Sequence, residues 1–234
     1  MRRVSRARPF IVCNLASSVD GKIDSVMREG GGFSSREDRD RLDALRAEVD
    51  ALVVGAETIR TEDPPLSIRA EQRRRRRVDE GREEQLRVIV LSRSGRMPAG
   101  ARFLREPAAR RWLAVPEGLE ASALAPLDEV IRRGDLEIVS AGRDGVDLHA
   151  LVARLADDGC KKIVVEGGGE VVAAFLEAGL IDEVRITLAP VLIGGREAPT
   201  PVGGDGWTIA ESKRLELVAH ERIGDELYLR YRVL

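Results

Sequence analysis

Short apolar, β-branched runs alternate with segments of helical pattern along most of this chain, and this alternation constrains the fold more than any other feature. Buried strands joined by helices are typical of a parallel sheet. The runs that predict strands are Phe10–Leu15, Ala51–Gly55, Arg87–Ser92, Trp112–Val115, Leu136–Ser140, Lys162–Val165 and Val184–Leu188. The predicted fold class is therefore α/β, with a mainly parallel central sheet and helices on both faces.

The segments between these strands predict the helices. Ser34 and Glu37 form an S-x-x-E capping box that opens a helix whose apolar residues recur at helical spacing. The other predicted helices are Ala56–Thr61, Ala123–Arg133, Leu148–Asp157 and Val171–Ala178. At the end of the chain, Lys213–His220 and Glu226–Val233 alternate like strands and predict an antiparallel pair at the edge of the sheet.

The composition, with 43% hydrophobic and 33% charged residues in 234, is that of a globular protein. We expect one domain over residues 1–234, with the arginine-rich segment 70–85 as a loop inserted in it. The apolar run Phe10–Leu15 is too short for the core of a signal peptide, and no run approaches the roughly 18 apolar residues of a membrane span. The expected location is the cytoplasm.

Cysteine and histidine are too scarce for a zinc site of the usual spacing or for a disulfide framework. The chain has only Cys13, Cys160, His149 and His220. We therefore expect no bound metal.

The net charge of −2, from 38 basic and 40 acidic residues, gives the whole chain no field that would attract nucleic acid or an anionic membrane. Five consecutive arginines, Arg73–Arg77, stand out, but acidic residues surround them, and a solvated surface segment is the favoured interpretation. A nucleic-acid-binding module is the alternative. Against this alternative, aromatic residues, which stack on bases in such modules, make up only 3% of the chain.

The sequence Glu166-Gly167-Gly168-Gly169 lies between a predicted buried strand and a predicted helix. Free N–H groups and the positive end of the helix would face an anion there, which favours a phosphate or pyrophosphate ligand. Glycines after a strand also form simple tight turns, and both interpretations stay open. Two further loops, Asn14–Lys22 and Gly55–Arg69, begin at the carboxyl ends of strands, where open α/β sheets bind their ligands.

These segments resemble the pyrimidine reductases of riboflavin biosynthesis, which share a dihydrofolate-reductase-like fold. The resemblance rests on the S-x-DGK loop, the V-G-x-x-T…DP-x-L-x-x-R pattern, the EGGG turn and a later AP-x-L-I-GG, present in this order. The continuation through Gly206 resembles the stand-alone archaeal enzymes acting on 2,5-diamino-6-ribosylamino-4(3H)-pyrimidinone 5′-phosphate. Neither H-x-E nor P-C-x-x-C occurs, so the zinc deaminase half of the bifunctional homologues is missing.

The resemblance implies an NADPH-dependent reductase, expected as a homodimer, that converts a ribosylamino group to ribitylamino. The residues it implies for the cofactor are Thr58, Glu62, Ser92, Gly167, Gly168, Gly169 and Glu170. Those it implies for the substrate are Asn14, Ser18, Asp20, Arg46, Asp63, Leu66 and Arg69. Arg46 and Arg69 would hold the 5′-phosphate. Lys22 and Glu166 are the expected proton-transfer pair, unless Glu166 only orients a hydroxyl of the sugar.

Two positions depart from the family pattern. Glu62 stands where Asp is usual, and Leu91 replaces an Asp commonly found before Ser92. A reductase of the same fold acting on another pterin or pyrimidine remains the alternative enzyme, because fold alone does not fix the reaction. Arg46 and Arg69 argue against a pterin without phosphate, which would leave both guanidinium groups unpaired.

Overall fold

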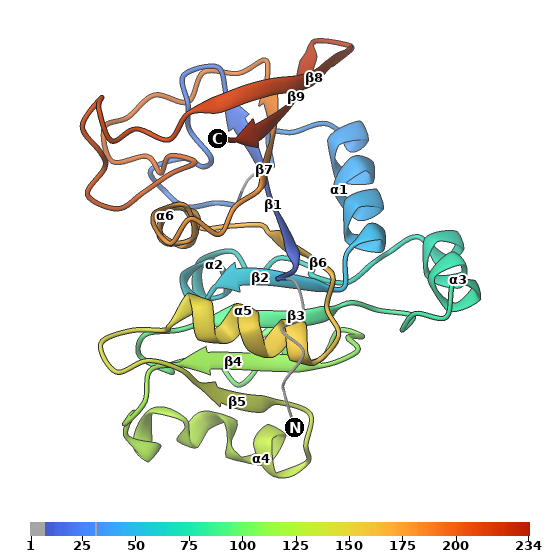
Figure 1. Cartoon of the computed structure of the whole chain (residues 1–234), viewed down its shortest axis with the longest axis vertical. Coiled ribbons are helices and arrows are strands. Elements are labelled where there is room, and N and C mark those ends of the chain that lie inside the picture. The colour runs from blue at the N-terminus through green and yellow to red at the C-terminus, as the bar shows by residue number, and fades with distance from the viewer. Residues whose placement is uncertain (1–7, 31) are drawn as a thin grey trace.

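The computed structural model describes residues 8–30 and 32–234. Residues 1–7 and 31, which belong to the predicted domain 1–234, lie outside the described residues. One nine-stranded sheet runs through the molecule in the order β5-β4-β3-β2-β6-β1-β7-β9-β8 (Figure 1). Its strands are β1 (Phe10–Ser18), β2 (Ala51–Gly55), β3 (Arg87–Leu91), β4 (Arg111–Val115), β5 (Glu137–Ser140), β6 (Lys162–Val165), β7 (Glu183–Ala189), β8 (Leu215–Ile223) and β9 (Glu226–Val233).

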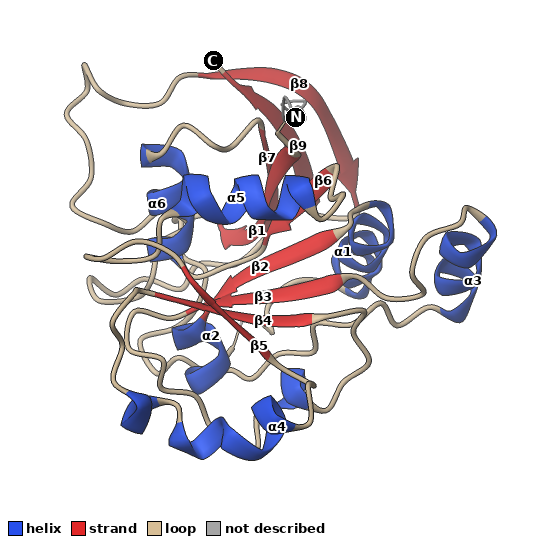
Figure 2. Cartoon of the chain, turned by 60° about the horizontal axis from the view of Figure 1, so that its bottom comes forward, coloured by secondary structure: helices blue, strands red, loops and turns tan. Residues whose placement is uncertain are grey.

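The seven predicted strands pair in parallel from β5 to β7, and β9 and β8 extend the sheet in antiparallel fashion. The predicted mainly parallel sheet with an antiparallel C-terminal pair is confirmed. Two apolar clusters, one on each face, form the core. Helices α5 (Leu148–Asp157) and α6 (Gly169–Glu177) pack on one face, and α1 (Arg36–Glu48) and α2 (Ala56–Thr61) pack on the other (Figure 2).

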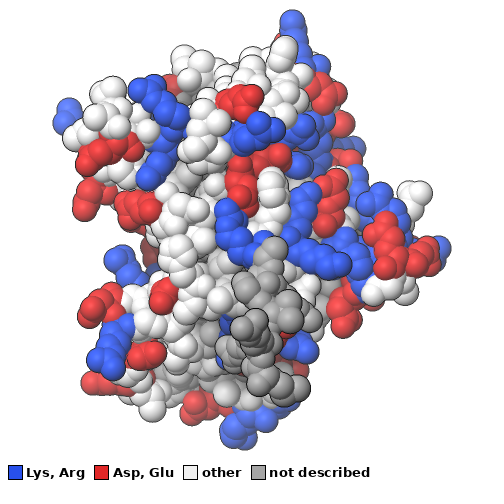
Figure 3. All heavy atoms as spheres, in the orientation of Figure 1, with Lys and Arg blue, Asp and Glu red and all other residues white. Residues whose placement is uncertain are grey.

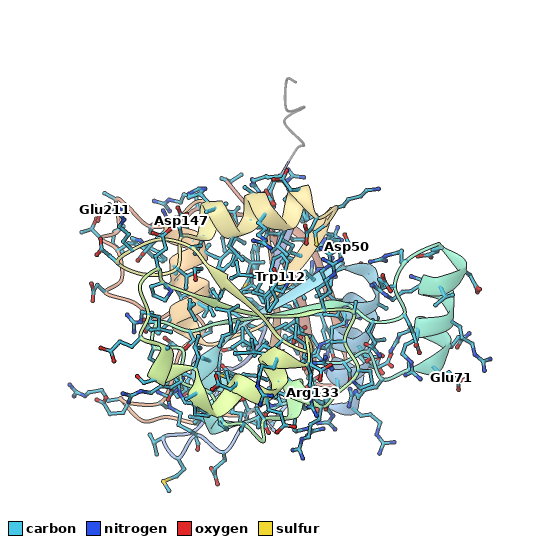
Figure 4. All side chains as sticks on the ribbon, turned by 90° about the horizontal axis from the view of Figure 1, so that it is seen from below. Asp50, Glu71, Trp112, Arg133, Asp147 and Glu211 are labelled. Carbon is cyan, nitrogen blue, oxygen red and sulfur yellow. The ribbon has the colours of Figure 1, made fainter. Side chains whose placement is uncertain are left out.

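Trp112 on β4 belongs to the first cluster and is 1% exposed (Figure 4). Successive residues of β4 contribute to opposite clusters, since Leu113 belongs to the second. This alternation is the expected behaviour of a strand covered on both faces. In the described part of the chain, none of the helices is long and apolar enough to cross a membrane.

Helix α1 begins one residue later than its capping box predicts. Its N-cap is Ser35, whose hydroxyl accepts the Asp38 N–H at 3.1 Å, so the prediction of Ser34 as the cap is wrong. The carboxylate of Glu226 accepts both the N–H and the hydroxyl of Ser35, at 2.8 and 2.6 Å. This contact from β9 selects between two adjacent serines that are equally good caps in sequence.

The prediction of the arginine-rich segment 70–85 as a loop is wrong for most of its length. Residues Glu71–Asp79 form helix α3, which lies to one side of the sheet beyond α1 (Figure 1). Arg77 of this helix is 2% exposed, and its guanidinium donates to the carbonyl oxygens of Ala47 and Val49. The interpretation of the whole run as solvated is therefore wrong for Arg77, whose charge lies at the C-terminal end of α1, where the helix dipole favours a cation.

The single helix predicted over Ala123–Arg133 is split into shorter pieces. Two 3-10 turns, Ala121–Ala123 and Ala125–Leu127, precede the short helix α4 (Asp128–Arg132). Pro126 explains the interruption, because proline cannot donate the hydrogen bond that a continuous helix requires.

Candidate active site

A cavity of about 400 Å³ opens beside the middle of β1 and at the carboxyl ends of β2 and β6, at the edge where parallel sheets bind ligands. It is also lined by α1 and by the chain that follows α2. Eleven of the sixteen residues predicted for the site line it: Asn14, Arg46, Thr58, Glu62, Leu66, Arg69, Glu166, Gly167, Gly168, Gly169 and Glu170.

The glycine turn forms one wall of this cavity. None of the described residues accepts a hydrogen bond from the N–H groups of Gly167, Gly168, Gly169 or Glu170, which lie at the start of α6. Gly168 has φ +42°, and a Cβ there would lie 3.5 Å from the Thr58 hydroxyl. Consecutive free N–H groups at a helix N-terminus are the usual arrangement for binding a phosphate oxygen.

Gly169 is required for a different reason. A Cβ on Gly169 would lie 2.6 Å from the Thr200 carbonyl oxygen and 2.9 Å from the Gly203 nitrogen. The Gly203 N–H donates to Gly169 O at 3.0 Å, and Gly204 N–H donates to the Glu170 carboxylate at 3.0 Å. The loop at residues 200–204 therefore packs directly on the first turn of α6 and holds Glu170.

Arg46 and Glu166 form an ion pair within the cavity wall. The Arg46 Nε and Nη2 donate to the two carboxylate oxygens of Glu166 at 2.8 and 2.6 Å, and both side chains are buried. Arg46 Nη1 also donates to the carbonyl oxygens of Pro65 and Ser67, at 2.9 and 3.3 Å. Four hydrogen bonds within the protein thus occupy a guanidinium that has five donors.

Three arginines with more exposed side chains also line the cavity. They are Arg69, Arg39 and Arg28, of which the sequence interpretation identified only Arg69. The Arg69 guanidinium donates to Arg39 O at 3.2 Å, and the Arg39 guanidinium donates to Ser34 O at 3.0 Å. Arg28 has φ 55°. Its backbone N–H donates to Ser25 O at 3.2 Å, and its guanidinium makes no hydrogen bond or ion pair within the described residues. No motif predicted Arg28 or Arg39, because only the folding of the chain brings them to the cavity that Arg69 also lines.

Glu62 lies at the cavity, close to two charged groups from the loop after β1. Partial burial and the Asp24 carboxylate raise the pKa of Glu62, and Arg28 acts in the opposite direction. Asp24 itself is buried and accepts hydrogen bonds from the Ser25 and Gly30 N–H groups, at 2.7 and 3.1 Å. A carboxyl group with a raised pKa at a ligand cavity is suited to donate a proton.

Asn14 lies in the middle of β1 and presents a free side chain to the cavity. Its amide has no hydrogen-bond partner among the described residues. A carboxamide offers both donors and an acceptor, which suits the edge of a nitrogen heterocycle.

Ser18, Asp20 and Lys22 do not line the cavity. The Asp20 carboxylate accepts the Ile193 and Gly194 N–H groups, and these bonds with that from the Ser18 hydroxyl lower the pKa of Asp20 to about 2. Lys22 Nζ donates to Ala198 O at 3.1 Å. These contacts tie the loop after β1 to the loop after β7.

The remaining two predicted residues also lie outside the cavity lining. Asp63 accepts the Arg102 N–H with both carboxylate oxygens, at 2.9 and 3.1 Å. Ser92 follows β3 and is 3% exposed, and its hydroxyl has no hydrogen-bond partner in the part of the chain that the structure describes. Within residues 8–30 and 32–234, the structure contains no cluster of three His, Cys, Asp or Glu side chains placed to hold a metal ion.

Comparison with known proteins gives consistent matches along the chain. A family model described as the RibD C-terminal domain matches residues 9–229. The 2,5-diamino-6-ribosylamino-4(3H)-pyrimidinone 5′-phosphate reductase of Archaeoglobus fulgidus is 37% identical, over 93% of this chain and 95% of that protein. The protein of the same name from Methanothermobacter thermautotrophicus is 35% identical, over 97% of this chain and 99% of the relative.

Solved structures agree on the fold. A pyrimidine reductase-like protein from Corynebacterium diphtheriae superposes with a TM-score of 0.81 at 24% identity, covering 97% of this chain and 92% of that one. RibD from Acinetobacter baumannii superposes with a TM-score of 0.78 at 22% identity, and this chain covers 58% of it.

Proposed function

This chain belongs to the family of the RibD C-terminal domain, and on that basis we propose that it catalyses a reduction in riboflavin biosynthesis. The reaction is the NADPH-dependent conversion of the ribosylamino side chain of a diaminopyrimidinone or amino-uracil 5′-phosphate to ribitylamino. One observation carries the proposal: a single cavity contains both an open glycine turn and Arg69, two separate groups suited to bind phosphates.

The glycine turn fits the pyrophosphate of a dinucleotide. Gly167 to Glu170 supply unpaired N–H groups, and Thr58 lies beside Gly168. Ser92 supplies an unpaired buried hydroxyl where β3 ends, two strands away from the turn. The next residue, Arg93, is exposed and without a partner among the described residues, which suits the additional phosphate of NADPH. When bound, NADPH supplies the hydride that is added to C1′ of the opened sugar.

The substrate would lie between the turn and α1. We propose that Arg69, with Arg39 beside it, binds the 5′-phosphate, and that Asn14 contacts the pyrimidine ring. Arg46 has four of its donors occupied, so its role is to orient Glu166 and leave at most one N–H for the substrate. Leu66 contributes an apolar contact at the cavity.

Proton transfer must accompany the reduction, because the sugar ring opens and its ring oxygen gains a proton. The contacts of Glu166 favour orientation of a sugar hydroxyl over proton donation, since Arg46 holds both carboxylate oxygens. The ammonium of Lys22 is bound to Ala198 O. We propose that Glu62, whose pKa is raised, is the proton donor.

We also propose that the protein is a homodimer located in the cytoplasm. Strand β8 is one of the two edge strands of the sheet, the other being β5, and its apolar residues Leu215, Leu217 and Val218 are 41, 51 and 40% exposed. A long exposed edge with apolar residues is suited to pairing with a second copy. Both Cys13 and Cys160 are buried free thiols, as expected in a reducing compartment.

The experiment that tests this function is steady-state oxidation of NADPH with the deaminated and the non-deaminated pyrimidine 5′-phosphates in parallel. We expect turnover with one or both of them, and at least tenfold lower kcat/KM for the same compound without its phosphate. Equal kcat/KM with and without phosphate would contradict the role of Arg69 and favour a reductase of another pterin or pyrimidine.

A further inference from the structure

Residues 65–70 form the last part of the connection between α2 and α3, and three of them, Pro65, Leu66 and Arg69, line the cavity. This connection contains no regular secondary structure. Side chains that bind a ligand from such a segment need support from their neighbours, because a small displacement of the backbone moves the charged group out of reach.

Asp43 supplies that support from α1. The residue is 3% exposed; its Oδ1 accepts the Arg69 N–H at 2.6 Å, and its Oδ2 accepts the Ala70 N–H at 3.2 Å. The Arg69 Nε also lies 3.9 Å from Asp43 Oδ1. Asp43 precedes Arg46 by three residues on the helix, so one face of α1 holds both ends of the 65–70 segment.

The arginine-rich helix completes the support. Arg73 Nη1 donates to Asp43 Oδ2 at 3.0 Å, and its guanidinium also pairs with the exposed Asp40 at 2.7 Å. Arg74 Nη1 donates to the carbonyl oxygens of Ile68 and Arg69, at 3.2 and 2.5 Å. The backbone on both sides of Arg69 is therefore fixed by side chains of α1 and α3.

The other arginines of the run are paired within the protein as well. Arg75 and Arg76 form pairs with Glu71 and Glu80, one helical turn away, and Arg77 is buried against α1. Glu71 lies on the outer part of α3 (Figure 4), and basic and acidic side chains mix on this side of the molecule (Figure 3). Arginines whose charges are compensated within the protein contribute little to binding the phosphates of a nucleic acid.

We propose that Arg73 and Asp43 are positioning residues that hold Arg69 in place for the phosphate of the substrate. The arginine-rich helix thus sets the affinity for the anionic end of the substrate without touching it. This inference rests on the proposed function, because it takes Arg69 as the phosphate ligand.

The test replaces Arg73 by Ala and compares it with Arg75→Ala, a matched variant on the same helix whose guanidinium pairs, among the described residues, only with Glu71. For Arg73→Ala we expect the KM for the phosphorylated substrate to rise about three- to thirtyfold, with kcat and the KM for NADPH unchanged. Arg75→Ala should behave like the wild type. Thermal unfolding of each variant shows whether the fold is retained.

A double-mutant cycle separates positioning from general loss of stability. In an Arg69→Ala background, Arg73→Ala should have no further effect on the KM, because the group it positions is gone. Full additivity would overturn the inference, and so would a KM for Arg73→Ala equal to that of Arg75→Ala.

The variants Arg73→Lys and Arg69→Ala decide the remaining outcomes. If Arg73→Ala does not fold, Arg73→Lys keeps a charge beside Asp43 but cannot bridge Asp40 and Asp43, and it should raise the same KM; no rise would overturn the inference. If Arg69→Ala alone leaves the kinetics unchanged, the phosphate assignment itself fails. If Arg69→Ala raises the KM and Arg73→Ala does not, only the positioning role fails.

Discussion

Gly168 and Gly169, in the glycine turn after β6, have different physical roles. Gly168 adopts a left-handed conformation next to Thr58 and the free N–H groups, so a side chain there would be strained and would face the proposed pyrophosphate position. Gly169 instead allows the backbone at Thr200 and Gly203 to approach. The third glycine is required by packing of the protein on itself.

Two substitutions distinguish these roles. We expect Gly168→Val to abolish binding of NADPH in a protein that still folds, because a β-branched residue resists φ +42° and fills the space beside the turn. Gly169→Ala should lower the unfolding temperature by displacing the loop at residues 200–204. Calorimetric titration with NADPH and thermal unfolding measure the two effects. Wild-type affinity in Gly168→Val would mean that the turn binds no cofactor.

Glu62 and Glu166 are expected to respond differently to replacement by Gln. If Glu62 donates the proton, Glu62→Gln should lower the single-turnover rate by about 10²–10⁴. The wild-type rate should fall as the pH rises through the raised pKa of Glu62, because the protonated form is then lost. Glu166→Gln should lower the rate by less than about tenfold, since Gln still accepts a hydrogen bond. A larger loss in Glu166→Gln than in Glu62→Gln would reverse the two roles.

Eleven of the residues that the sequence motifs predicted line the cavity, but the motifs did not reveal the contacts between them. The pairing of Arg46 with Glu166 joins residues 120 positions apart, and no local pattern encodes it. Lys22 illustrates the opposite case. Its motif is distinctive, yet the fold directs its ammonium to Ala198 O, on the loop after β7.

At the level of elements, apolar periodicity predicted the parts of the fold that bury apolar side chains. Helix α5 has the predicted bounds because its three leucines and Val152 recur at helical spacing. Helix α3 has almost no apolar residues, and its arginines bind to α1 and to the 65–70 segment. Such a helix depends on tertiary contacts, so periodicity could not reveal it.

The start of α1 gives a prediction about stability. Burial acts to raise the pKa of Glu226, but hydrogen bonds from Ser35 and the Tyr228 hydroxyl lower it overall. A lowered pKa means that this carboxylate stabilises the fold above its ordinary pKa of about 4.5 and that the contribution is lost as the pH falls below it.

Replacing Glu226 by Gln should therefore lower the free energy of unfolding at neutral pH by about 1–3 kcal/mol. The variant should also lose less stability than the wild type on acidification. Denaturant unfolding at a series of pH values measures both effects. Identical acid dependence in the two proteins would show that Glu226 does not link β9 to α1.

At the scale of the whole molecule, the order of elements predicted the sheet and its antiparallel end, because buried parallel strands and an exposed hairpin differ in sequence. The exposed edge at β8 belongs to this scale. We expect Leu217→Lys to convert a dimer to a monomer with little loss of thermal stability, because the side chain is half exposed in the isolated chain. Analytical ultracentrifugation of both proteins checks this. A monomeric wild type would contradict the proposed interface.

The most direct test of the central claim follows the hydride itself. The protein is incubated with NADPH carrying two deuterium atoms at C4 of the nicotinamide and with the phosphorylated pyrimidine substrate, and the product is examined by mass spectrometry. We expect a ribitylamino product with a single deuterium, located at C1′, formed in step with oxidation of NADPH. A product without deuterium at C1′, or oxidation of NADPH without formation of the ribitylamino group, would contradict the proposed reaction.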